Sequence, residues 1–264
     1  MTTGIKYPPG HWIRDASPRQ GLEQYLGQQR LTYSRIKNRF VQDLLGDLTG
    51  KTFLDYGCGG GFFLIHAVHS KARLVMGVDA EENVLATARF FLDRQGAAGP
   101  VHLIRSDQFP AFRPETKFDV ILMKDVIEHV PDDLGLVRAA ASVLAPGGRM
   151  VLSTQNALSL NCLIQGTWNR RVRNNKAWLG WDPTHLRFYT PNRLKRILAS
   201  AGLACRGWRA SYLIPYKWPA PRFLKRQFVR VDFLSVADRA LGACFPFNRL
   251  GWNVAVLAVS DEKG

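Results

Sequence analysis

The stretch Leu54-Asp55-Tyr56-Gly57-Cys58-Gly59-Gly60-Gly61 places a cluster of glycines between the apolar run Thr52 to Leu54 and a helix-like run from about Phe62 to His69. Glycine lets backbone N–H groups approach a bound molecule closely. The start of the following helix favours a carboxylate or a phosphate. The stretch therefore predicts a strand, a turn and a helix, with a ligand held at the turn.

The spacing of these glycines excludes two common nucleotide-binding loops. The pattern G-x-G-x-x-G requires a glycine at its sixth position. That position is Phe62 if the pattern begins at Gly57, and Leu64 if it begins at Gly59, so the pattern is absent. A phosphate-binding loop ending in Gly-Lys-Ser or Gly-Lys-Thr is also absent. The stretch instead matches the pattern D-x-G-x-G-x-G, formed by Asp55, Gly57, Gly59 and Gly61.

Strand-like and helix-like segments alternate on the C-terminal side of this loop. Helices are predicted over about 62–69, 81–95 and 134–145, and strands over 74–78, 101–104, 118–123 and 149–154. Such alternation predicts β-α-β units and a parallel sheet. Further along the chain, we expect a helix that begins at Thr190-Pro191 and strands over about 205–213 and 252–259.

Acidic residues follow successive strands of this predicted sheet. Asp79 closes the second strand, twenty residues after Gly59, where a carboxylate is placed to bind two ribose hydroxyls. Asp107 closes the third strand and can accept a hydrogen bond from an adenine amino group. Asp55 and Asp79 could instead only cap turns, but the whole set at the carboxyl ends of parallel strands favours a nucleoside site.

These motifs together resemble the class I S-adenosylmethionine-dependent methyltransferases, most closely the group that includes the ubiquinone-biosynthesis and natural-product O-methyltransferases. The likeness is strongest over about 50–154 and also includes FDVILMKDVIEHV (118–130) and LAPGGRMVLST (144–154). It implies a Rossmann-like α/β fold with a seven-stranded sheet in the order 3-2-1-4-5-7-6, its last strand antiparallel. It also implies that S-adenosylmethionine is held by Asp55, Gly57, Cys58, Gly59, Gly61, Phe63, Asp79, Ala80, Ser106, Asp107 and Lys124.

The resemblance also suggests how the chain is divided. Residues 1–49 are expected to form an N-terminal arm and a helical cap, and residues 50–264 the methyltransferase domain. Insertions at about 155–182 and 215–250 interrupt that domain. We expect them to cover the ligand crevice and to select the acceptor.

Two histidines are candidates for the base that a hydroxyl acceptor requires. Imidazole titrates near neutral pH and accepts protons well. His129 follows the fourth predicted strand in a turn that is common in this family, and His185 lies where relatives place a histidine that faces the substrate. The sequence favours His185, and O-methylation with it. The alternatives are N-methylation, RNA methylation or a non-catalytic subunit that binds the cofactor.

The same residues admit a metal-dependent site. Asp125, Glu128 and His129, taken with His185, resemble the metal-binding pattern of some ubiquinone-pathway and small-RNA methyltransferases. Asp125 stands where those relatives carry glutamate, and the motif is also widespread in relatives without metal. The sequence therefore favours a site that works without a divalent ion.

Charge is distributed very unevenly along the chain. The net charge is +15, and residues 155–264 carry 18 Lys and Arg against 5 Asp and Glu. This excess predicts an acidic or lipid-linked acceptor, or contact with an anionic membrane, and RNA less strongly because no RNA-binding module is recognisable. The alternative is that the excess only keeps the surface soluble. Residues 222–230 predict a basic amphipathic helix suited to a membrane surface, although such a helix could also pack as a lid.

The remaining features favour a cytoplasmic protein. No apolar stretch reaches the roughly 18 residues of a membrane-spanning helix, and the N-terminus lacks the apolar region of a signal peptide. The chain has four cysteines, Cys58, Cys162, Cys205 and Cys244, and none of them forms a C-x-x-C pair. They are too few for a disulfide scaffold in a chain of this length, so they also favour a reducing, cytoplasmic setting.

Overall fold

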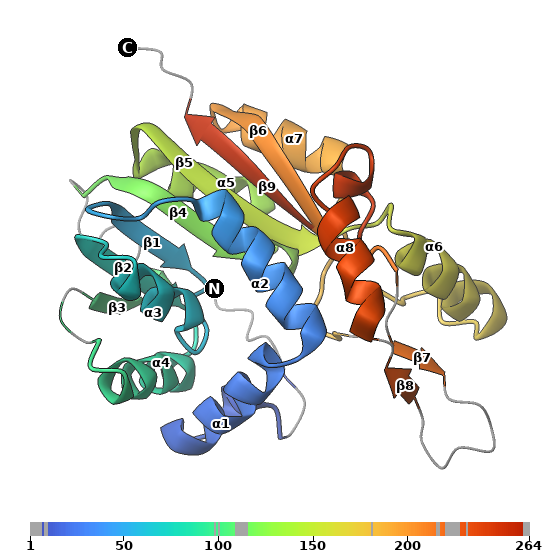
Figure 1. Cartoon of the computed structure of the whole chain (residues 1–264), viewed down its shortest axis with the longest axis horizontal. Helices are drawn as coiled ribbons and strands as arrows, with labels where there is room; N and C mark the ends of the chain where they lie inside the picture. Colours follow the sequence, from blue (N-terminus) through green and yellow to red (C-terminus); the bar gives the residue numbers. More distant parts are fainter. Residues whose placement is uncertain are drawn as a thin grey trace.

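A computed structural model shows a central sheet with helices on both faces (Figure 1). It describes residues 7, 10–97, 99, 101–108, 116–180, 182–214, 217–219, 228–230 and 232–260. The seven strands of the sheet are β1 (Thr52–Tyr56), β2 (Leu74–Asp79), β3 (Val101–Arg105), β4 (Phe118–Lys124), β5 (Leu144–Gln155), β6 (Leu203–Ser211) and β9 (Asn253–Ser260). Their order, β3-β2-β1-β4-β5-β9-β6, confirms the predicted topology. β9 runs antiparallel to both of its neighbours, β5 and β6, as predicted.

The strands bury successive side chains on opposite faces of the sheet, which is typical of a parallel sheet covered on both sides. Phe53 packs with one hydrophobic cluster and its neighbour Leu54 with the other. α1 to α4 contribute to the first cluster, and α5 and α7 to the second. The helices are α1 (Pro18–Gln29), α2 (Thr32–Leu45), α3 (Phe62–His69), α4 (Glu82–Arg94), α5 (Asp133–Ser142), α6 (Leu160–Thr167), α7 (Pro191–Ser200) and α8 (Ser235–Leu241).

The predicted boundary between α5 and β5 is wrong by a few residues. The helix expected to run to residue 145 ends at Ser142, and β5 begins at Leu144 rather than at Arg149. Leu144 pairs with Phe118, whereas Arg149 pairs with Val120, so the intervening residues form an irregularity in β5. Gly147 permits it with a φ of +67°.

The second insertion differs from its prediction. The basic amphipathic helix expected over 222–230 is wrong at its end, because β8 (Phe228–Arg230) is a strand that pairs antiparallel with β7 (Lys217–Pro219). Residues 222–227 of that predicted helix lie outside the described residues. The first insertion contains α6 and a π-helical turn, Trp168–Val172. Among the described residues, no helix combines the length and the apolar character that crossing a membrane requires.

Candidate functional site

The glycine loop between β1 and α3 is fastened to the end of β2. The N–H groups of Gly57 and Cys58 both donate to the carbonyl oxygen of Val78, at 2.7 and 2.9 Å. Gly57 and Gly61 have φ values of +82° and +88°, in the left-handed region that favours glycine. A Cβ atom at Gly57 would stand 2.2 Å from Cγ2 of Val126. Glycine is therefore needed here for both backbone conformation and space.

Asp79 organises the loop from the end of β2. One carboxylate oxygen accepts the N–H of Gly59 at 3.0 Å. The other accepts the N–H groups of Ala80 and Glu81, at 2.8 and 3.3 Å. Burial raises the pKa of this carboxyl to about 6, although the three backbone N–H groups act in the opposite direction. Asp79 is thus ionised at neutral pH and lies beside the loop, as the predicted ribose-binding role requires.

Two aromatic residues before the methyltransferase motifs cover the same loop. A Cβ atom at Gly60 would stand 2.5 Å from the ring of Tyr25, which belongs to α1. The Tyr25 hydroxyl accepts the N–H of Phe62 at 3.4 Å. Trp12 packs on Tyr25 with ring centroids 4.9 Å apart. Sequence analysis missed both residues, because only the packing of α1 and of the short helical turn Trp12–Arg14 before it brings them to the loop.

The other predicted cofactor residues occupy different environments. Burial raises the pKa of Asp55 to about 7, opposed by the positive charge of Lys124. Cys58 and Phe63 point into the core, so their side chains support the loop from beneath. Ser106 and Asp107 follow β3, where the exposed Asp107 carboxylate pairs with the guanidinium of Arg105.

Replacing Gly57 tests how tightly this loop is packed. We expect Gly57→Ala to lower the free energy of unfolding by about 2 kcal/mol, through overpacking and a strained φ, and to weaken cofactor binding. Gly27→Ala is the matched control, because Gly27 lies in α1 with no atom within 4 Å of an added Cβ. That change should raise the unfolding free energy by up to about 1 kcal/mol. Thermal unfolding measures both effects, and an unchanged melting temperature for Gly57→Ala would contradict the packing described.

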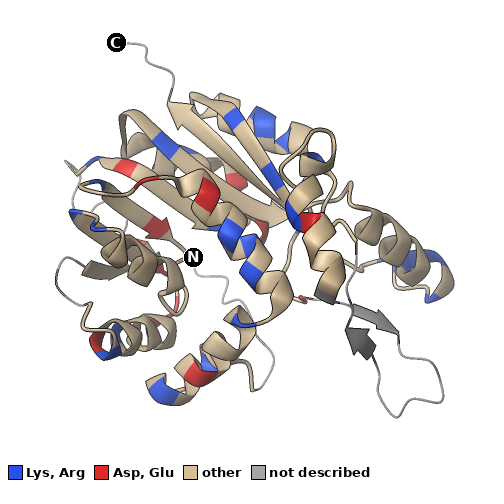
Figure 2. Ribbon diagram, in the orientation of Figure 1, with Lys and Arg blue, Asp and Glu red and all other residues tan. Residues whose placement is uncertain are grey.

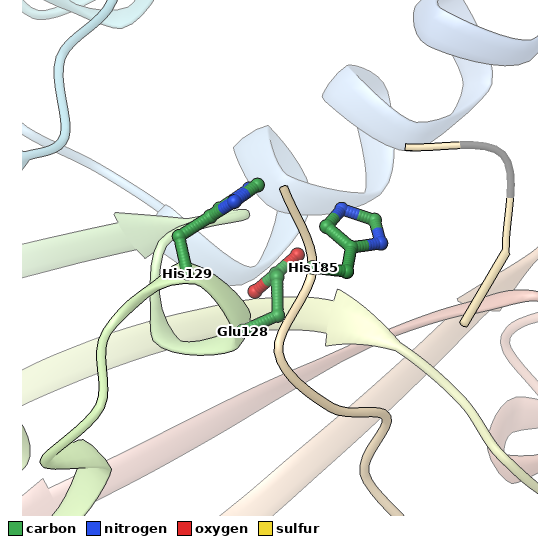
Figure 3. Close-up of side chains that lie close together, drawn as sticks. All are labelled: Glu128, His129 and His185. Carbon is green, nitrogen blue, oxygen red and sulfur yellow. The ribbon is translucent and has the colours of Figure 1, made fainter. Parts of the chain in front are cut away.

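His129, His185 and Glu128 come together just beyond β4 (Figure 3). Their ligand atoms lie within 4.8 Å of one another, and the two imidazole centroids are 4.8 Å apart. In Figure 3 the Glu128 carboxylate points from the turn after β4 toward the two rings. Glu128 is fully buried, and one of its oxygens accepts the hydroxyl of Thr154 at 2.8 Å. Its other oxygen has no hydrogen-bond partner among the described residues.

The segment 182–189 positions His185 against the turn after β4. The N–H of Leu186 donates to the carbonyl oxygen of Glu128 at 2.9 Å. Thr184 contacts Nδ1 of His129 through its hydroxyl, at 3.0 Å. Nε2 of His185 lies 3.8 Å from a carboxylate oxygen of Asp182. Burial lowers the pKa of His185, and the nearby His129 acts in the same direction. His185 is therefore neutral at neutral pH and free to accept a proton.

The carboxylate of Asp125 forms ion pairs with two lysines. Lys37 from α2 and Lys124 from β4 both pair with its carboxylate. Burial opposes ionisation of Asp125, but the two ammonium groups outweigh it and hold the pKa of this carboxyl well below its usual range. Lys37 is a further residue that sequence analysis missed. Lys37 reaches Asp125 from α2, 88 residues earlier in the chain, and its place in the amphipathic pattern of α2 does not indicate a role at the site.

Comparison with known proteins agrees with this geometry. A family model described as "Methyltransferase domain" matches residues 25–206. The "Ubiquinone biosynthesis O-methyltransferase" of Idiomarina loihiensis is 33% identical over 182 residues, which cover 64% of this chain and 68% of the relative. The protein of the same name from Thiobacillus denitrificans is 32% identical over 168 residues, covering 64% of this chain and 70% of the relative.

Solved structures share the fold at low sequence identity. Magnesium protoporphyrin IX methyltransferase from Synechocystis PCC 6803, crystallised with bound SAH, has a TM-score of 0.60 at 16% identity and covers 94% of this chain and 98% of its own. An S-adenosylmethionine-dependent methyltransferase from Mesorhizobium loti has a TM-score of 0.56 at 20% identity, with coverage of 85% and 97%. At these identities the likeness concerns the fold alone.

Proposed function

The chain belongs to the S-adenosylmethionine-dependent methyltransferases, and on this premise we propose that it methylates a hydroxyl oxygen of a small-molecule, sugar or lipid-linked acceptor, with His185 as the base. The observation that carries the proposal is the contact between the imidazole rings of His129 and His185, which come from separate parts of the chain and meet at the turn after β4. The names of the relatives support oxygen as the accepting atom.

The residues around the glycine loop fit the methyl donor. Asp79 offers carboxylate oxygens for ribose hydroxyls, and Gly57, Gly59 and Gly61 give the loop the left-handed backbone conformation that lets N–H groups approach a ligand. When bound, S-adenosylmethionine supplies an electrophilic methyl group on a sulfonium, so the protein has to position the acceptor, accept the hydroxyl proton and exclude water. Phe188 packs against His185, and the buried rings of Trp178 and Trp252 pack on Phe188 in turn, so this aromatic group is suited to excluding water.

His185 is the better base of the two histidines. Its imidazole is neutral at neutral pH, and Asp182 stands beside Nε2 to stabilise the charge that a captured proton brings. His129 is held by the hydroxyl and the carbonyl oxygen of Thr184. We therefore assign His129 to positioning the His185 ring and His185 to taking the hydroxyl proton.

A mass-spectrometric screen tests the proposed reaction. Purified protein is incubated with cell extract and S-adenosylmethionine carrying a deuterated methyl group. We expect a compound to gain one labelled methyl group on an oxygen, located by fragmentation. A labelled nitrogen would instead assign N-methylation, and cofactor binding without any labelled product would assign a non-catalytic role.

A divalent cation has a defined candidate site here. Glu128, His129 and His185 would hold it, and it would make an acceptor hydroxyl more acidic. The fourth residue of the sequence pattern, Asp125, does not fit this role, because Lys37 and Lys124 bind its carboxylate. Burial also raises the pKa of Glu128, which disfavours its charged form.

We therefore expect turnover to survive exhaustive chelation with EDTA. The measurement is the initial rate of labelled methyl transfer before and after chelation, with S-adenosylhomocysteine binding as the control for folding. A rate that falls on chelation and returns with Mg²⁺ would assign the three residues to a cation.

A further inference from the structure

The insertion after β5 carries a row of exposed apolar side chains. Leu160, Leu163, Ile164 and Trp168 expose 59%, 53%, 59% and 57% of their surfaces. They occupy positions i, i+3, i+4 and i+8, which fall on one side of a helix. The row extends from α6 into the π-helical turn that follows it.

α6 is oriented the opposite way from a helix that covers a core. Its buried side consists of Asn161, Cys162 and Gly166, whereas its larger apolar side chains face outward. α7 shows the usual arrangement, with Leu194 and Leu198 fully buried. Single exposed apolar residues are common, but a continuous row on one helix indicates a surface that is covered in use.

Basic residues adjoin this row without any acidic neighbour. Arg170, Arg171 and Arg173 follow the last turn of α6 and are exposed. Residues 156–181 contain no Asp or Glu. Figure 2 shows the basic residues at the far end of α6 and the turn after it, on a helix that is otherwise uncharged. The surface thus combines an apolar stripe with positive charge.

We propose that α6 and the turn Trp168–Val172 dock onto an anionic lipid bilayer. Aliphatic and Trp side chains enter the boundary between head groups and acyl chains, while the arginines contact anionic head groups. A second copy of this chain is disfavoured, because it carries a net charge of +15 and the same arginines. The phosphates of a nucleic acid would pair with the arginines, but a nucleic acid has no apolar surface that would bury the side chains of Leu163 and Ile164.

This surface adjoins the candidate site. The N–H of Ala157, three residues before α6, donates to the carbonyl oxygen of Tyr189 at 2.7 Å. The chain that enters α6 therefore runs beside the segment that carries His185. A docked bilayer would lie near the segment 182–189, but the proposal stands on the surface itself and not on the identity of the acceptor.

Co-sedimentation of the full chain with vesicles tests the proposal. We expect binding to vesicles of phosphatidylcholine mixed with phosphatidylglycerol, and little binding to phosphatidylcholine alone. Leu163→Gln combined with Ile164→Gln should weaken binding at least about tenfold. Arg170→Gln combined with Arg171→Gln should weaken it by about tenfold or more. The arginine pair remains informative if the apolar pair impairs folding.

The matched control is Arg89→Gln combined with Arg94→Gln. It removes the same charge from α4, which lies on the other side of the molecule from α6 (Figure 1). This control should bind vesicles like the unchanged protein, and every variant should bind S-adenosylhomocysteine normally. Absence of vesicle binding by the unchanged protein, an equal loss in the α4 control, or a dimer that Leu163→Gln with Ile164→Gln dissociates would overturn the proposal. Binding to an RNA oligonucleotide that depends on Arg170 and Arg171, with no binding to vesicles, would assign the surface to nucleic acid instead.

Discussion

Asp79→Asn is expected to weaken the binding of S-adenosylhomocysteine about 100-fold, the effect of losing about two charge-assisted hydrogen bonds. The Asp79 carboxylate accepts backbone N–H groups with both of its oxygens. An amide has only one acceptor oxygen, so its NH₂ group would face either the N–H of Gly59 or that of Ala80. The change therefore disturbs the loop and also removes the charge predicted to bind the ribose. Isothermal calorimetry measures the dissociation constant.

The pH dependence of binding provides a second measurement on the same residue. Because burial raises the pKa of Asp79 to about 6, the carboxyl becomes protonated as the pH falls through that value and loses acceptor capacity. Cofactor affinity should therefore fall below about pH 6 in the unchanged protein, and this dependence should disappear in Asp79→Asn. Asp93→Asn, at the exposed end of α4, is the control. Unaltered affinity in Asp79→Asn would remove Asp79 from the cofactor site.

His185→Ala is expected to lower kcat by about 10²- to 10⁴-fold, the range typical of losing a general base. The dissociation constant for S-adenosylhomocysteine should stay unchanged, because His185 contacts the turn after β4 rather than the glycine loop. Single-turnover rates and calorimetry on the same preparation separate the two quantities. His69→Ala, at the exposed end of α3, controls for the loss of an imidazole.

The pH profile of kcat distinguishes a base from a structural residue. Burial lowers the pKa of His185, so the neutral imidazole persists to lower pH than usual. In the unchanged protein kcat should stay level down to about pH 6.5, the ordinary pKa of histidine, and fall below it. The residual rate of His185→Ala should lack this fall. Full activity in the variant would exclude His185 as the base, and a larger loss in His129→Ala would transfer the role to His129.

The central part of the fold could be predicted because its signals are local. Each strand from β1 to β4 is an apolar run, and Gly57, Gly59 and Asp79 mark the turns at fixed spacings. Such patterns depend on neighbours along the chain, and two of the successive strand pairs, β1 with β2 and β2 with β3, also lie side by side in the sheet. The order of the sheet came from the family resemblance rather than from the spacing.

The parts that could not be predicted depend on distant contacts. Lys37 pairs with Asp125, 88 residues away, and Tyr25 packs on Gly60 only because α1 folds over the loop. The alternation of basic and apolar residues over 222–230 suggested a helix, but pairing with β7 makes its last residues a strand. Tertiary contacts of this kind override local preference.

The position of β9 has a consequence for how the protein is made. β5 and β6 do not pair with each other, and each forms its ladder with β9, which follows both in the chain. During synthesis the sheet therefore presents open edges until residues 253–260 have left the ribosome. Unpaired strand edges invite association with other nascent chains. A chaperone bound to these edges, or rapid elongation, would limit such association until that strand arrives.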